Sequence, residues 1–236
     1  MNNMSETEKI AKAIQELAKF GTKGLDIADK AGSFFAKIFK EPGEEVVGMI
    51  TDKLRFIRWS RMVNMSEKVN NILEEKNITE TRAVPPKIAL PILEGATLEV
   101  NLTLQGLWNN LLANAMNPKF NDEIRYGFID MIKGITGIEA NLIKFLFDSL
   151  QKDNKLQIIA KVTQYGFNKE QIMQVLNIKD DVYSLSANNL MRLQLISPLI
   201  LKSSAKLGNE PMTINKGIDS ITLTPLGVKF VEACMK

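Results

Sequence analysis

Apolar residues recur at helical spacing through most of the N-terminal two thirds of the chain. The range Ile10–Phe39 holds a line of apolar and small residues in steps of three and four, and a Ser5–Glu8 capping box precedes it. A second line spans Glu45–Lys76, after a break at Glu41–Glu44 that contains a proline and a glycine. The pattern predicts two long helices that can pair as an antiparallel hairpin.

The range Arg82–Pro118 has a different pattern, with paired prolines followed by a long apolar stripe. A proline disfavours helix before it but suits the first helical turn, so Pro85 and Pro86 predict a helix that begins at the second of them. From Thr103 onwards, leucines and Trp108 lie at the spacing of one buried helix face. We expect these two helices to pack together as the central core.

Three helices are expected after Pro118, and the last seventy residues then change character. The three ranges are Asn121–Ile132, Ile138–Leu150 and Asp153–Thr163. Beyond them we expect helices at Lys169–Leu176 and Ser186–Leu193 (capped by Ser184 or Ser186), β-prone stretches at Leu195–Leu201 and Ser220–Leu223, and a final helix through Cys234 that Thr224 caps. This order of elements resembles a winged helix.

The predicted fold is mainly α-helical, with a small winged-helix-like α+β unit at the C-terminal end. We expect N-terminal amphipathic helices over residues 1–80, a central helical core over 81–165 and the winged-helix-like unit over 166–236.

Several short stretches carry a more specific pattern. They are Val84-Pro85-Pro86-Lys87-Ile88-Ala89-Leu90-Pro91, Leu93-Glu94-Gly95-Ala96, Leu107-Trp108-Asn109-Asn110-Leu111-Leu112-Ala113-Asn114-Ala115-Met116 and Leu223-Thr224-Pro225-Leu226-Gly227. In these stretches the chain resembles the bacterial abortive infection alpha (Abi-alpha) family. The resemblance implies a role in phage defence, and it implies no catalytic mechanism.

The composition removes several classes of chemistry. The chain has no histidine and one cysteine, Cys234, so Ser-His and Cys-His nucleophile pairs, histidine-ligated zinc and thiolate metal cages are excluded. It also lacks the glycine-rich loops that cradle phosphates. Its net charge of +3 does not by itself call for a nucleic-acid partner. We therefore expect no catalytic residues, no metal and no cofactor.

The first candidate surface lies on the N-terminal helix. Basic residues recur there every seven positions, opposite bulky apolar residues, which is the pattern of a helix that lies at an anionic lipid surface. An ordinary core helix with solvated lysines has the same pattern. The candidates for membrane or partner contact are Lys23, Lys30, Phe34, Phe35, Lys37 and Phe39.

A second candidate is a basic-aromatic patch on the next helix, formed by Arg55, Arg58, Trp59 and Arg61. Interleaved arginines and aromatic rings can hold phosphates and stack on bases or lipid headgroups. Arginine and tryptophan are also enriched in protein interfaces, and the patch is equally explained by pairing with acidic residues or another subunit.

The third candidate is the winged-helix-like end. In a DNA-binding version Asn188, Asn189 and Arg192 would face the groove, and Lys202 would contact phosphate. The local positive charge is sparse for such a domain, and winged helices also serve as protein-interaction modules.

These observations lead to one hypothesis and one alternative. The hypothesis is a non-enzymatic phage-defence effector or sensor that acts through a membrane surface or a protein partner, with self-association as a further option. The alternative is a nucleic-acid-binding regulator that uses the C-terminal unit. With no apolar run long enough to span a bilayer and no signal-peptide pattern, we expect a cytoplasmic protein that can contact the inner membrane peripherally.

Overall fold

A computed structural model describes residues 33–34, 37–38, 55–153, 159–207, 210–215 and 217–236, with side chains outside 55–60, 159–161 and 201–215. The chain divides into two compact units, Met1–Val100 with Gln105–Ile129 and Asn101–Leu104 with Asp130–Lys236. Helix α8 (Gly137–Lys152) packs with the C-terminal elements and belongs to the second of these units.

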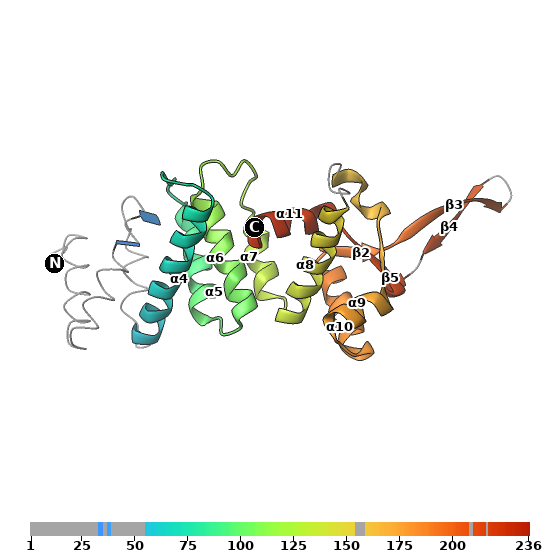
Figure 1. Cartoon of the computed structure of the whole chain (residues 1–236), viewed down its shortest axis with the longest axis horizontal. Coiled ribbons are helices and arrows are strands. Elements are labelled where there is room, and N and C mark those ends of the chain that lie inside the picture. Colours follow the sequence, from blue (N-terminus) through green and yellow to red (C-terminus); the bar gives the residue numbers. More distant parts are fainter. Residues whose placement is uncertain (1–32, 35–36, 39–54, 154–158, 208–209, 216) are drawn as a thin grey trace, which may run out of the picture. The chain divides into compact units, whose positions relative to one another are not determined.

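The first unit is built around three helices: α4 (Arg55–Glu75), α5 (Pro86–Leu98) and α6 (Leu102–Met116), all visible in Figure 1. Helix α5 begins at the second proline, as predicted, with Pro85 as its N-cap. The apolar stripes of the three helices meet in a core that includes Met62, Met65, Val69, Leu73, Ala89, Ile92, Leu93, Leu107, Trp108, Leu111 and Leu112.

The segment between α4 and α5 is fastened to the C-terminal end of α6. The Arg82 backbone N–H donates to the Met116 carbonyl at 2.8 Å, and Arg82 Nε donates to the Ala115 carbonyl at 2.9 Å. The last carbonyls of a helix have no partner within the helix, so an arginine placed here satisfies two of them. Lys76 Nζ adds a bond of 2.7 Å to Asn114 Oδ1, and burial lowers the pKa of this lysine.

Helix α7 (Tyr126–Lys133) lies where the chain passes between the units. The second unit then contains α8, the short 3-10 helix η1 (Ile159–Gln164), β1 (Phe167–Asn168), α9 (Lys169–Leu176), α10 (Asp180–Arg192), β2 (Ile196–Pro198), β3 (Ile200–Leu207), β4 (Glu210–Asn215), η2 (Gly217–Asp219), β5 (Ser220–Leu223) and α11 (Pro225–Cys234). The mainly helical fold with a small α+β part is therefore confirmed.

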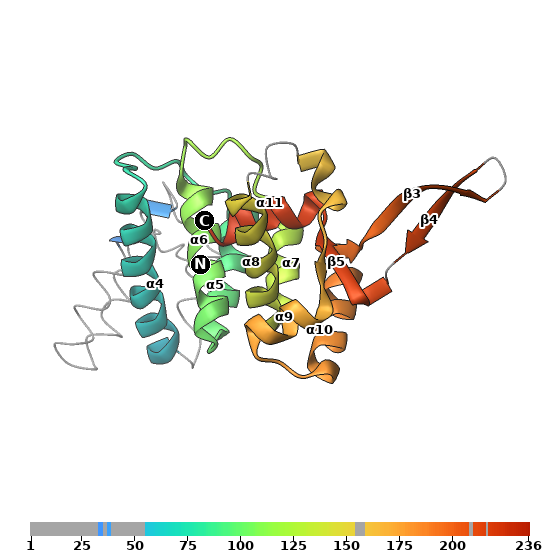
Figure 2. The same cartoon turned by 45° about the vertical axis from the view of Figure 1, so that its right-hand side comes forward.

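Three short strands form an antiparallel sheet in the order β1-β5-β2, with Phe167 opposite Ile221 and Ile196 opposite Leu223. Strands β3 and β4 form a separate hairpin between β2 and β5, and this hairpin extends away from the sheet (Figure 2). Helix α9 occupies the predicted range, and so does α11, which Thr224 caps.

Three helix predictions need correction. The helix expected at Asn121–Ile132 begins at Tyr126, as α7. Helix α10 begins at Asp180 and not near Ser186, because Tyr183, Ala187 and Leu190 form one buried stripe that starts earlier. Two aspartates in its first turn suit the positive end of the helix dipole, and Ser186 is buried inside the helix. The helix expected at Asp153–Thr163 is replaced in its described part by η1.

Candidate functional site

The N-terminal candidates are only partly described by the structure. Lys23, Lys30, Phe35 and Phe39 lie outside the described residues. The Phe34 side chain is 3% exposed, so it packs in the interior and not on a surface that a membrane could contact. Lys37 is exposed, and its Nζ donates to Asn70 Oδ1 at 2.8 Å. Membrane contact through this segment stays a prediction.

The basic-aromatic patch lies on α4. The side chains of Arg55, Arg58 and Trp59 are outside the described part, so only Arg61 can be placed. Its Nη1 donates to the backbone carbonyl of Thr97 at 2.8 Å, close to the C-terminal end of α5. Arg61 thus contacts a helix end of its own unit, where a cation is favourable.

The residues proposed for the DNA groove form an internal network. Asn189 Nδ2 donates to the Gly134 carbonyl at 2.8 Å and to Glu139 Oε1 at 2.9 Å, while Arg192 donates to Asn189 Oδ1 at 2.7 Å through Nη2. Glu139 is only 4% exposed and also closes the capping box of α8 with Thr136. The Asn189 amide therefore orients a buried carboxylate and is not directed outwards to read a base, as the prediction had it.

The outward face of α10 carries acidic, apolar, amide and basic side chains. Asp181, Leu185, Asn188 and Arg192 are all exposed at steps of three and four, and Leu185 is 72% exposed. Helices that enter a DNA groove present polar and basic side chains, whereas this face contains an acid and a large apolar residue. The side chain of Lys202, on β3, lies outside the described part.

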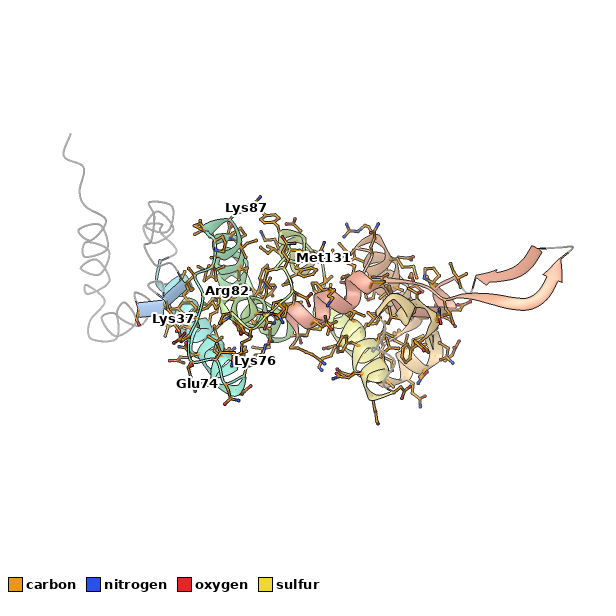
Figure 3. The ribbon with its side chains drawn as sticks, turned by 90° about the horizontal axis from the view of Figure 1, so that it is seen from above. Lys37, Glu74, Lys76, Arg82, Lys87 and Met131 are labelled. Carbon is orange, nitrogen blue, oxygen red and sulfur yellow. The ribbon has the colours of Figure 1, made fainter. Side chains whose placement is uncertain are left out.

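The first unit contains a groove of about 660 Å³ on the paired-proline segment. Arg82 and Lys87, labelled in Figure 3, line it together with residues from the end of α6 and from the loop that leads to α7. The whole lining is Arg82, Ala83, Val84, Pro85, Lys87, Ile88, Ala115, Phe120, Asn121, Asp122, Glu123, Ile124 and Tyr126. We call this the Pro-Pro groove.

The Pro-Pro groove combines an apolar surface with charges of both signs. Ile88, Phe120 and Ile124 are half-buried, and the Tyr126 ring is 43% exposed at the start of α7. Basic side chains come from the segment before α5 and from its first turn, and acidic ones from the loop at Asp122–Glu123. Such a lining can hold a ligand segment that is partly apolar and carries both positive and negative charges.

Sequence reasoning did not identify this groove. It interpreted the prolines as the start of a core helix, which is correct, but gave no role to the charged residues after Pro118. The run Asn121–Arg125, placed between a helix-ending proline and an aromatic residue, was the available signal. Surface loops often carry binding residues, because they tolerate exposed polar groups.

Titratable groups in the second unit serve its packing. The Tyr183 hydroxyl donates to the Ile218 carbonyl at 2.6 Å, and burial raises the pKa of its phenol. The hydrogen bond to Asp180 raises the pKa of Lys169, which also lies 5.9 Å from the Tyr183 ring centroid. Within the described residues there is no cluster of three or more acidic or cysteine side chains arranged for a metal.

A comparison with protein families identifies the chain. The model of the family described as abortive infection alpha matches residues 60–234, which include the paired prolines, α6 and the second unit as far as Cys234. The chain belongs to the abortive infection alpha family. Membership supports a role in abortive infection, a form of phage defence. No curated protein and no solved structure matches the chain. Among the described helices of this abortive infection alpha protein, none has the length and apolar character needed to cross a membrane.

Proposed function

We propose that this abortive infection alpha protein is a non-enzymatic defence component that recognises a segment of a protein partner in the Pro-Pro groove. The observation that carries the proposal is the groove itself, about 660 Å³ in volume and lined by the paired-proline segment. Binding pockets for small ligands and short segments fall in the range of roughly 300–1,000 Å³.

The chemistry of the lining favours a peptide over a lipid or a nucleic acid. A peptide segment offers apolar side chains, backbone polar groups and charges of both signs, and the groove offers partners for each. Anionic lipid headgroups and phosphodiester backbones would meet Asp122 and Glu123 on the loop that lines the groove, and like charges repel. A protein partner is the occupant that uses both the basic and the acidic residues.

We further infer that the second unit is a winged helix used for protein contact. The sheet order β1-β5-β2, the two helices between β1 and β2, and the hairpin between β2 and β5 support this assignment. Helix α10 would then occupy the place of the recognition helix. Its acidic and apolar outward face favours a protein over DNA, and fold alone does not decide between them.

The test uses charge reversal in the groove of the full-length protein. Lys87 is exposed in the first turn of α5, where a carboxylate is favourable, so Lys87→Glu should keep the fold while it alters the groove. Lys152→Glu is the matched control, because Lys152 is exposed on α8 and lies outside both the groove and α10. Cells that express each variant are challenged with a phage against which the native protein protects.

We expect Lys87→Glu and Tyr126→Ala to lose protection at unchanged thermal stability, and Lys152→Glu to keep it. Full protection by both groove variants would refute the groove as the binding site. A gel shift of the native protein with salt-dependent affinity for DNA would instead favour the nucleic-acid alternative. A cytoplasmic location with peripheral contact at the inner membrane stays part of the proposal.

A further inference from the structure

A second, smaller cavity lies between α4, α5 and α6 in the first unit. It measures about 20 Å³ and is lined by Arg61, Asn64, Met65, Lys68, Ala96, Gln105 and Asn109. A buried water needs about 10–15 Å³ on this scale, so the cavity admits one or two oxygen atoms of a small group whose remainder lies outside it.

The lining of this cavity has a clear charge preference. Arg61 and Lys68 contribute two positive charges, and the amides of Asn64 and Asn109 contribute further donors, while no carboxylate of the described residues lines the cavity. Arg61 uses Nη1 to bind the Thr97 carbonyl, which fixes the guanidinium and leaves its other N–H groups for a ligand. Lys68 is half-buried, and within the described part of the chain it forms no ion pair.

Asn109 supplies an independent observation. Its side chain is 5% exposed and lines the cavity, yet it makes no hydrogen bond to any residue that the structure describes. Nearly all buried amides in proteins are hydrogen-bonded, because an unpaired polar group in the interior is unfavourable. Its neighbours Asn110 and Asn114 both have partners, Gly106 and Lys76 respectively. Of these three amide side chains on α6, the unpaired one is the one that lines the cavity.

We propose that this cavity is a binding site for one phosphate-type oxyanion group, held by Arg61 and Lys68 and oriented by the Asn109 amide. Arginine binds phosphate oxygens through a planar fork, lysine adds a point charge, and a short amide donor completes the set. The group can belong to a lipid headgroup or to a soluble phosphate monoester. This site is separate from the Pro-Pro groove and does not depend on the function proposed for that groove.

The experiment titrates the full-length protein with inorganic phosphate, and the binding isotherm is measured by calorimetry. We expect saturable binding that weakens by about tenfold or more in Lys68→Gln and in Asn109→Asp, since each removes a charge-assisted interaction or adds repulsion. Asn109→Asp keeps the size of the side chain, and two cations surround it, so the variant should fold. If it does not fold, Lys68→Gln at its half-exposed position carries the test.

Matched controls separate a built site from general electrostatic attraction. Asn71→Asp makes the same charge change at an exposed position of α4, and Lys119→Gln removes an exposed lysine of the same unit that lines neither the cavity nor the Pro-Pro groove. Both should bind phosphate as the native protein does. Absence of saturable phosphate binding, or equal weakening in all four variants, would overturn the proposal.

Two further arms identify the source of the phosphate group. Vesicles that contain phosphatidic acid are compared with vesicles of phosphatidylcholine alone, and glycerol 3-phosphate is used as a soluble monoester. Binding to phosphatidic acid vesicles that Asn109→Asp abolishes would assign the site to a lipid headgroup. Binding of glycerol 3-phosphate without vesicle binding would assign it to a soluble ligand.

Discussion

The indole ring of Trp108 lies directly against Gly95. A β-carbon on Gly95 would be 2.6 Å from Cζ2 and 2.7 Å from Cη2 of the tryptophan, closer than real side-chain contacts allow. The glycine therefore lets α5 and α6 approach, and Trp108, at 1% exposure, fills the space between them. Its Nε1 is buried and has no hydrogen-bond partner among the described residues, so the ring contributes to stability by packing alone.

Gly95→Ala should lower the free energy of unfolding by about 1–3 kcal/mol, because the new methyl group forces the indole or the helix to move. Alanine is the better helix former by about 1 kcal/mol, so intrinsic propensity predicts the opposite sign. Gly106→Ala in α6 is the control, since a β-carbon there has no neighbour within 4 Å and should stabilise the protein. Urea unfolding of both variants measures their free energies of unfolding. If Gly95→Ala is as stable as the native protein, the contact between residue 95 and the Trp108 ring does not limit the size of the side chain there.

The sequence predicted the elements whose local signals agree with their packing. Pro86 starts α5 and Thr224 caps α11 because a proline in the first turn and a hydroxyl at the N-cap act within one turn of chain. The stripe around Trp108 has the period of a helix and is buried as expected. These features need no knowledge of distant parts of the chain.

Features that depend on distant partners were missed. Strand β1 has two residues and exists because Phe167 pairs with Ile221 across the sheet. No local sequence pattern predicts this pairing. The internal hydrogen bonds of Asn189 were missed for the same reason, since its partners Gly134 and Glu139 lie fifty or more positions away. The Pro-Pro groove likewise combines a loop with a helix start that the sequence separates.

Gly227→Ala should destabilise the second unit strongly. A β-carbon on Gly227 would overlap the carbonyl oxygen of Leu195, a backbone atom that cannot turn away as a side chain can. That carbonyl already accepts the Thr224 N–H at 3.1 Å, so the start of α11 and the end of α10 are joined here. We expect a loss of about 3 kcal/mol or more, in the upper range of overpacking substitutions.

Thermal unfolding followed by circular dichroism measures the effect of this substitution. Gly127→Ala, at a helical glycine with no neighbour within 4 Å of the added carbon, serves as the comparison and should be neutral or stabilising. Equal melting temperatures for the two variants would contradict the close approach of α11 to Leu195.

The adjacent residues Asn188 and Asn189 should respond differently to alanine. Asn189→Ala removes a donor from the buried Glu139 carboxylate and should cost about 1–3 kcal/mol of unfolding free energy. Asn188 is exposed, and Asn188→Ala should change stability by no more than about 0.5 kcal/mol. Chemical unfolding distinguishes the two. A base-contacting role for Asn189 would instead leave its stability unchanged and reduce DNA affinity.

The buried thiol of Cys234 should make the protein less stable in alkaline solution. Burial raises the pKa of this thiol well above its ordinary value of 9.0, so the native state keeps the proton to a higher pH than the unfolded chain does. Above pH about 8.5–9 the unfolded chain loses this proton while the native state retains it, and the free energy of unfolding falls as pH rises. Below that pH range the thiol is protonated in both states, and its full contribution to the free energy of unfolding is present.

Urea unfolding of the native protein and of Cys234→Ala between pH 7 and about 10 tests this relationship, and the range follows from the ordinary thiol pKa. The alanine variant should lose part of the alkaline decline, while the phenol of Tyr183, whose pKa burial also raises, contributes in both proteins. A thiol reagent should react with Cys234 slowly in the native protein and rapidly in urea. Fast reaction in the native state, or identical pH profiles, would show that the last helix opens and exposes the sulfur.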